Sequence, residues 1–106
     1  MNKEKLIRAR FRTSVFTRDK YKCKICNDSN EILDAHHILP RKQMPNGGYV
    51  KENGITLCPS CNLEAEDFLN GDLTTFAGKN YDYSPANFLK LIGSSVELAY
   101  EKSKLL

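Results

Sequence analysis

The chain has 106 residues, a net charge of +3 and 41% hydrophobic residues, which indicates one small globular domain with a modest core. No apolar run approaches the roughly 20 residues that a membrane span needs. The charged first residues do not look like an export signal, so we expect a cytoplasmic protein. Residues 1–22 hold eight Lys or Arg against two acidic residues, whereas the remainder holds eight against eleven. This asymmetry favours a polyanionic partner that is bound by the N-terminal part.

The first predicted element is a helix over residues 3–18, which no Gly or Pro interrupts. Its apolar stripe at helical spacing consists of Leu6, Ile7, Phe11 and Val15. Basic side chains surround this stripe, and phosphate contacts are one interpretation of them, with a solvated basic face as the equal alternative. The candidates for such contacts are Arg10, Arg12 and Arg18.

Two C-x2-C pairs, Cys23–Cys26 and Cys58–Cys61, give the strongest chemical signal. Without an export signal, such pairs favour zinc over a disulfide or redox role. Four thiolates fill a tetrahedral site and leave no open position, so the zinc would be structural. The 31 residues between Cys26 and Cys58 are enough to hold a functional hairpin.

The stretch around the second cysteine pair reads as strand, loop, strand and helix. We predict strands over residues 31–36 and Gly54–Leu57. The loop 38–52 between them is marked by two prolines and an Asn-Gly-Gly turn. A helix should follow; its predicted N-cap, first position and stop are Cys58, Pro59 and Gly71.

Residues 71–83 are predicted to be irregular, and a last helix is predicted over about residues 84–105, opened by Ser84-Pro85. We expect this helix to close the core with one continuous apolar face. That predicted face consists of Phe88, Leu91, Ile92, Val96 and Ala99. The predicted fold class is therefore α+β.

The adjacent pair His36-His37 lies at the end of the first predicted strand. Successive strand residues point to opposite sides, so one imidazole can bind a metal while the other faces a substrate. Imidazole titrates near neutral pH, which makes the neutral form available as a general base. Histidines with a purely structural role are the alternative.

Asn62 and Glu66 are four residues apart on the predicted helix and share one of its faces. Both offer oxygen ligands, and together with an imidazole they suit a divalent ion such as Mg, Mn or Ni. The alternative is a helix start with solvated polar groups.

The chain resembles the HNH endonuclease family in a set of motifs that occur in the family's order. These motifs are C-K-I-C, D-A-H-H-I-L-P, G-G and E-N-G-I-T-L-C-P-S-C-N. The resemblance covers roughly residues 11–68. It implies a small ββα-metal domain with a structural zinc, flanked by N- and C-terminal helices. The implied single domain spans residues 1–106, with its core motif over about 11–70. The implied activity is metal-dependent hydrolysis of DNA phosphodiester bonds.

The resemblance also implies residue roles. His37 would be the general base, His36 a metal ligand, and Asn53 the residue that orients the loop carrying the base. The family usually has a ligand His at the position of Asn62, and many members have a further His at that of Glu66. Some relatives carry Asn at the first of these positions and work with Mg or Mn. The chain therefore resembles an H-N-N variant with a harder ligand set, which favours Mg or Mn over zinc at the catalytic site, with Ni as a further candidate.

Arg41 and Lys42 follow the His pair and are candidates to hold the DNA backbone, with loop solubility as the alternative. The expected partner is double-stranded DNA, bound by a monomer or a homodimer. We expect the protein to be encoded by a phage or mobile element and to act in the host cytoplasm. Homing, restriction, packaging and recombination are all candidate roles. Two other classes are a non-catalytic zinc-stabilised DNA-binding module and a protein-interaction domain with structural histidines.

Overall fold

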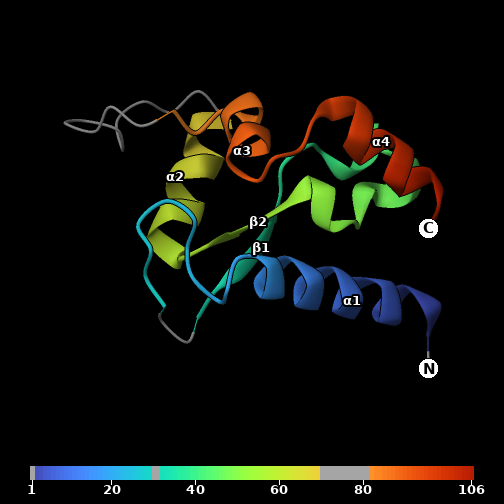
Figure 1. Cartoon of the computed structure of the whole chain (residues 1–106), viewed down its shortest axis with the longest axis horizontal. Coiled ribbons are helices and arrows are strands. Elements are labelled where there is room, and N and C mark those ends of the chain that lie inside the picture. The colour runs from blue at the N-terminus through green and yellow to red at the C-terminus, as the bar shows by residue number, and fades with distance from the viewer. Residues whose placement is uncertain (1, 30–31, 70–81) are drawn as a thin grey trace.

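The computed structural model of the protein describes residues 2–29, 32–69 and 82–106. Two strands and four helices, with three short 3-10 turns (η1–η3) between the strands, make up this part of the chain (Figure 1). In chain order these elements are α1 Lys3–Arg18, β1 Asp34–His37, η1 Arg41–Gln43, η2 Pro45–Gly48, η3 Lys51–Asn53, β2 Gly54–Leu57, α2 Pro59–Leu69, α3 Pro85–Leu91 and α4 Val96–Lys104. None of the helices described is long and apolar enough to cross a membrane.

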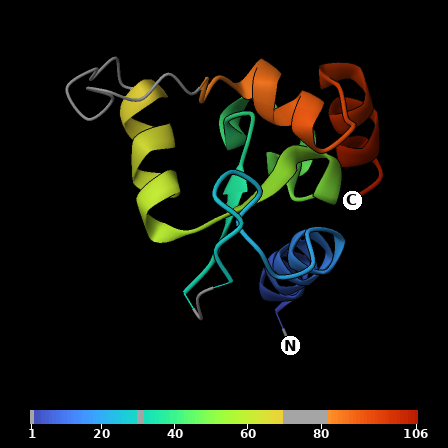
Figure 2. The same ribbon diagram turned by 60° about the vertical axis from the view of Figure 1, so that its left-hand side comes forward.

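The two strands pair antiparallel, with His36 opposite Ile55 and His37 opposite Gly54. Figure 2 shows α1 on one side of this pair and α2 on the other. The predicted α+β class and the order strand, loop, strand, helix are confirmed. The first strand begins at Asp34, because residues 32 and 33 are irregular; residue 31 lies outside the described residues.

The predicted N-terminal helix is confirmed, and its apolar stripe packs directly on β2. Phe11 and Val15 are buried and meet the strand at Gly54. A Cβ atom on Gly54 would lie 2.5 Å from Val15 Cγ2 and 2.7 Å from Phe11 Cε1, distances that no side chain tolerates. Glycine at the start of β2 therefore sets how closely α1 approaches the hairpin.

A polar clamp fixes the C-terminal end of α1 to β2. Arg18 Nη2 donates to the carbonyl of Gly54 at 2.7 Å, and its Nη1 donates to that of Lys51. The same guanidinium forms an ion pair with Asp19 at 2.8 Å, and Asp19 Oδ2 accepts from the Thr56 amide at 2.9 Å. Backbone groups of β2 that its partner strand does not reach thereby gain partners.

The prediction of one C-terminal helix is wrong, because the chain forms two. Gly93 has φ +70° and ends α3 in a Schellman motif, in which Ser94 N–H donates to Leu89 C=O at 2.8 Å. The Ser95 side chain then caps α4 by accepting from Leu98 N–H at 3.1 Å. The predicted single apolar face is broken as well, since Val96 is 53% exposed whereas Phe88 and Ala99 are buried.

After the break, α4 packs on η2 and η3 of the hairpin loop, whereas Phe88 and Leu89 of α3 belong to the hydrophobic core. Ser94 Oγ donates to Glu52 C=O at 2.8 Å, and Asn46 Nδ2 donates to Ser103 C=O at 3.0 Å. The C-terminal helices therefore hold η2 and η3 in place. The predicted stop at Gly71 and most of the predicted irregular segment 71–83 lie outside the described residues.

Candidate functional site

The four cysteines converge on one point, with all four Sγ atoms within 4.8 Å of one another. Thiolates on a tetrahedral zinc are about 3.8 Å apart, given a Zn–S bond of about 2.3 Å. Three of the four cysteines are buried and none forms a disulfide, so the donor set fits a structural zinc.

The backbone around the cysteines ties their site to α2 and to β2. Burial raises the pKa of Cys23, but hydrogen bonds from the backbone N–H groups of Cys26, Cys58 and Ile25 outweigh it, so the net shift is downward. Burial raises the pKa values of Cys26 and Cys61. Cys58 caps α2 as predicted, because its carbonyl accepts from Asn62 N–H at 2.9 Å and its Sγ from Cys61 N–H at 3.5 Å. The first cysteine pair is held to β2 by a hydrogen bond that Lys24 N–H donates to Thr56 C=O at 3.0 Å. The four-cysteine site therefore fixes α2 relative to the hairpin.

That placement brings Asn62 on α2 against His36 on β1. His36 Nδ1 and Asn62 Oδ1 lie 3.0 Å apart. Two ligands at adjacent positions of an octahedral ion, each about 2.1 Å from it, are separated by about 3.0 Å. Burial lowers the pKa of His36, although Asn62, Glu66 and Asp34 partly offset this. The imidazole is therefore neutral and can act as a metal ligand. The pair fits a hard or borderline divalent ion.

A cavity of about 430 Å³ opens around this pair. Its polar lining residues are Asp34, His36, His37, Arg41, Asn62 and Glu66. The prediction placed five of these in one site, and the structure brings those five together. Asp34 is the sixth, and it accepts a hydrogen bond from Asn62 Nδ2 at 3.3 Å, which leaves Asn62 Oδ1 facing His36.

His37 points to the other face of β1, as strand alternation requires. Its ring stacks on Phe11 at a centroid distance of 4.5 Å, and Tyr49 meets it edge-on at 4.6 Å. Burial, then the charges of Arg41 and His36, lower the pKa of His37 to about 4. Its Nε2 is buried without a hydrogen-bond partner. A buried polar atom without a partner is costly and marks functional positions in native proteins.

Asn53 is fully buried and holds the loop that follows His37. Its Oδ1 accepts from Leu39 N–H at 2.9 Å, and its Nδ2 donates to the carbonyls of Leu39 and Gly48 at 3.3 and 3.2 Å. The Asn53 carbonyl accepts from Ile38 N–H at 2.9 Å. Gly48 has φ +68°, and a Cβ there would lie 2.6 Å from Asn53 Nδ2, which explains the second glycine of the G-G motif. This geometry suits the loop-orienting role that the sequence predicts for Asn53.

The predicted basic contacts lie in different places. Arg41 lines the cavity beside His37, and Lys42 is exposed next to it. Arg12 is exposed on α1, with its Cζ 5.6 Å from the ring centroid of Phe16. Their contacts to DNA stay predictions.

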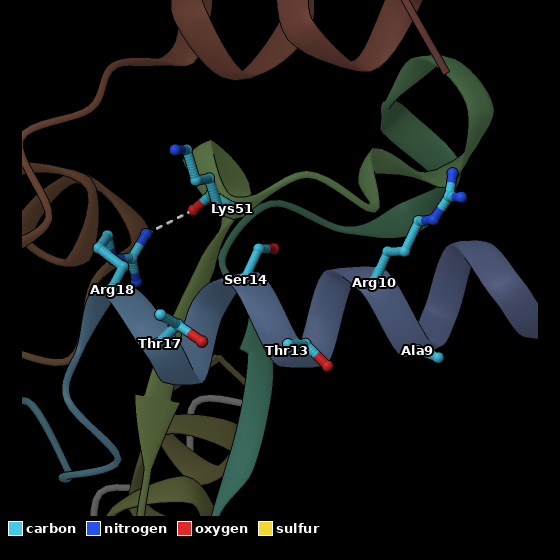
Figure 3. Close-up of a pocket in the computed structure, with 7 residues that line it drawn as sticks. All are labelled: Ala9, Arg10, Thr13, Ser14, Thr17, Arg18 and Lys51. Atoms are coloured by element: carbon cyan, nitrogen blue, oxygen red, sulfur yellow. Dashed lines mark hydrogen bonds between the residues drawn. The ribbon is translucent and has the colours of Figure 1, made fainter.

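Arg10 and Arg18 lie on another flank of α1, along a shallow groove of about 740 Å³ (Figure 3). Neither is among the residues that line the His36–His37 cavity. Figure 3 shows Arg18 turned toward the carbonyl of Lys51, while Arg10 projects from the helix without a drawn partner. Arg18 therefore has a structural role in the clamp to β2, and its contact to DNA stays a prediction.

Sequence reasoning missed two residues near the site, Asp34 and Tyr49, and it placed Arg8 only on the general basic face of the first helix. Asp34 could have been found, because it precedes His36 by two residues in a strand and therefore shares its face. Tyr49 and Arg8 gave no local signal, since their contacts depend on the turn at η2 and on the seating of α1.

A family model described as HNH endonuclease matches residues 23–68. The matched segment contains the four cysteines, β1, the loop, β2 and most of α2. No curated protein and no solved structure matches the chain.

Proposed function

We propose that the chain is a metal-dependent DNA endonuclease of the HNH family that hydrolyses phosphodiester bonds, and the HNH endonuclease model that matches residues 23–68 supports this. One observation carries the proposal. The side chains of His36 on β1 and Asn62 on α2 form a pair of possible metal ligands at one cavity. The neutral imidazole of His37 lines the same cavity and comes from the opposite face of β1.

His37 is the proposed general base. Its low pKa keeps the imidazole neutral at physiological pH, which is the form that accepts a proton. A water molecule attacks phosphorus, and its proton goes to the imidazole. The bond from phosphorus to the 3′ oxygen breaks, and the leaving 3′ oxygen takes a proton from a solvent water to become the 3′ hydroxyl. The stacked Phe11 ring and the edge-on Tyr49 ring fix the orientation of the His37 imidazole, so little orientational freedom is lost when substrate binds.

The proposed ligands of the catalytic ion are His36 and Asn62, with Glu66 as a further oxygen donor from the same cavity. A divalent ion bound there would supply Lewis-acid stabilisation for the charge that builds on the scissile phosphate. One nitrogen and two oxygen donors favour Mg²⁺ or Mn²⁺. Asp34 is not counted as a ligand, because its carboxylate is engaged by the Asn62 amide.

Asn53 and Arg41 are the proposed supports of this chemistry. Asn53 keeps the backbone after His37 in one conformation through its bonds to Leu39 and Gly48. Arg41 brings an exposed guanidinium to the edge of the cavity, where it can pair with a phosphate of the bound DNA next to the scissile one.

The test is nicking of supercoiled plasmid by the zinc-loaded protein, with and without added Mg²⁺ or Mn²⁺. We expect cleavage only with the added ion, and products with 5′-phosphate and 3′-hydroxyl ends. Retention of DNA without cleavage under any added ion would instead support the non-catalytic DNA-binding module.

A further inference from the structure

Tyr49 joins two arginines that lie far apart in the sequence. Arg41 Nη1, at the start of η1, donates to the Tyr49 hydroxyl at 2.9 Å. Arg8, on α1, lies over the same residue, with its Cζ 6.0 Å from the Tyr49 ring centroid. The hydrogen bond from Arg41 lowers the pKa of Tyr49, and the nearby guanidinium of Arg8 lowers it further.

The Tyr49 ring is fixed by its surroundings. It meets Phe11 edge-on at a centroid distance of 5.6 Å and His37 edge-on at 4.6 Å. Gly47 leaves room for it, since a Cβ there would lie 2.8 Å from Tyr49 Cε2. The hydroxyl is therefore a fixed point between the two arginines.

Neither Arg8 nor Arg41 forms an ion pair within the described part of the chain, where the pairs join Arg18 to Asp19 and Lys104 to Glu101. The carboxylate of Glu4 lines the same cavity as Arg8 and offsets part of the positive charge. Both arginines are exposed, and the neutral hydroxyl that accepts from Arg41 does not remove its charge. Two cations held close together repel each other, and an anion placed between them would relieve that repulsion.

We propose that Arg8 and Arg41, held together through Tyr49, bind a phosphodiester group that lies next to the scissile phosphodiester in the bound DNA. The proposal rests on the proposed function and deepens it. Arg41 lines the cavity of His36 and His37, whereas Arg8 and Tyr49 line the neighbouring one, so this Tyr49 clamp would take a flanking phosphate. Guanidinium groups are suited to this task because they offer paired donors to phosphate oxygens.

The experiment measures affinity for a short duplex against salt concentration, with zinc-loaded protein and no added divalent ion, so that the DNA stays intact. Arg8→Gln and Arg41→Gln should each weaken binding roughly threefold to tenfold. Each should also reduce the magnitude of the slope of log affinity against log salt by about 0.9, because one phosphate contact is lost. Lys102→Gln, an exposed cation on α4, is the matched control and should leave affinity and slope unchanged.

Tyr49→Phe separates the hydroxyl from the ring. It keeps the ring contacts to Phe11, His37 and Arg8 but removes the hydroxyl to which Arg41 donates, so affinity should fall while the slope stays near that of the wild type. In the background of Arg8→Gln with Arg41→Gln, the same change should have no further effect. Tyr100→Phe, on exposed α4, should behave as wild type.

The outcomes separate this proposal from the proposed function. Wild-type protein that nicks plasmid, together with Arg8→Gln and Arg41→Gln variants that bind like Lys102→Gln, would overturn the clamp and leave the nuclease. The expected losses of affinity and slope in a protein that never cuts DNA would support the clamp and overturn the nuclease. A further effect of Tyr49→Phe in the double-arginine background would show that its hydroxyl acts through other groups.

Discussion

Asn53 shows how much of the site depends on one buried amide. Asn53→Ala would leave the Leu39 amide and the carbonyls of Leu39 and Gly48 without partners in the interior. We expect a loss of about 2–4 kcal/mol in the free energy of unfolding, measured by urea denaturation. Asn87→Ala, which removes one exposed hydrogen bond to Asp82, should cost less than about 1 kcal/mol. Equal stability of Asn53→Ala and wild type would mean that the loop does not need this amide.

The ligand pair makes a prediction about metal preference. Asn62→His should keep a metal site but move the preference of cleavage toward Ni, Co or Zn, because imidazole binds borderline ions better than an amide does. Asn62→Ala should lose most of the activity with Mg, and Glu66→Ala should lose less, since water can replace an exposed ligand. The measurement is cleavage rate against metal identity for these variants.

An Asn62→Ala variant as active as wild type with Mg would contradict this part of the account. In that case Asn62 is no ligand, and Asp34, two residues before His36, becomes the first alternative.

At the residue scale the sequence predicted what its motifs encode. His36, His37, Asn53 and Asn62 lie in short patterns, and the structure brings them around one strand end. Tyr49 could not be predicted, because its ring reaches His37 only after Asn46 and Gly47 adopt positive φ in the turn at η2. Such contacts depend on tertiary structure and leave no periodic signal.

At the scale of elements, the join between α1 and β2 is the feature most exposed to mutation. Asp19→Ala would leave the Thr56 amide buried without a partner and would release Arg18 from its ion pair. Arg18 is partly exposed, so we expect a loss of about 1–3 kcal/mol in the free energy of unfolding rather than the larger cost of a fully buried pair.

Chemical denaturation measures this loss, and Glu101→Ala is the control. Its ion pair with Lys104 lies on the exposed face of α4 and should contribute under about 0.5 kcal/mol. A loss in Asp19→Ala no larger than that in Glu101→Ala would show that the polar clamp does not hold α1.

The elements that were predicted correctly follow local rules. α1 has an uninterrupted apolar stripe, and α2 starts with Cys58 as its cap and Pro59 at its first position. The division of the last helix was missed although Gly93, Ser94 and Ser95 carry the signals for a C-cap and a new N-cap. The apolar residues on both sides keep helical spacing across the break, so their periodicity alone predicts a single helix.

At the scale of the molecule, the four-cysteine site is the joint between α2 and the hairpin. We expect about one tightly bound zinc per chain by elemental analysis. Cys58→Ser should destabilise the whole fold, because it removes a zinc ligand and because metal binding is coupled to folding in small domains. Well-folded wild-type protein without zinc would contradict this prediction.

The packing of α1 on Gly54, the zinc joint and the Asn53 bonds have one chemical consequence, the placement of His37 beside the ligand pair. The most direct measurement is the single-turnover rate of DNA cleavage by His37→Ala with saturating enzyme and Mg²⁺. Circular dichroism, zinc content and duplex affinity establish that the variant is folded and binds. Gln43→Ala, an exposed change in the same loop, is the control and should cleave at the wild-type rate. We expect His37→Ala to be slower by about 100- to 10,000-fold, the usual contribution of a general base. A rate within about twofold of wild type would contradict the assignment of His37 as the base.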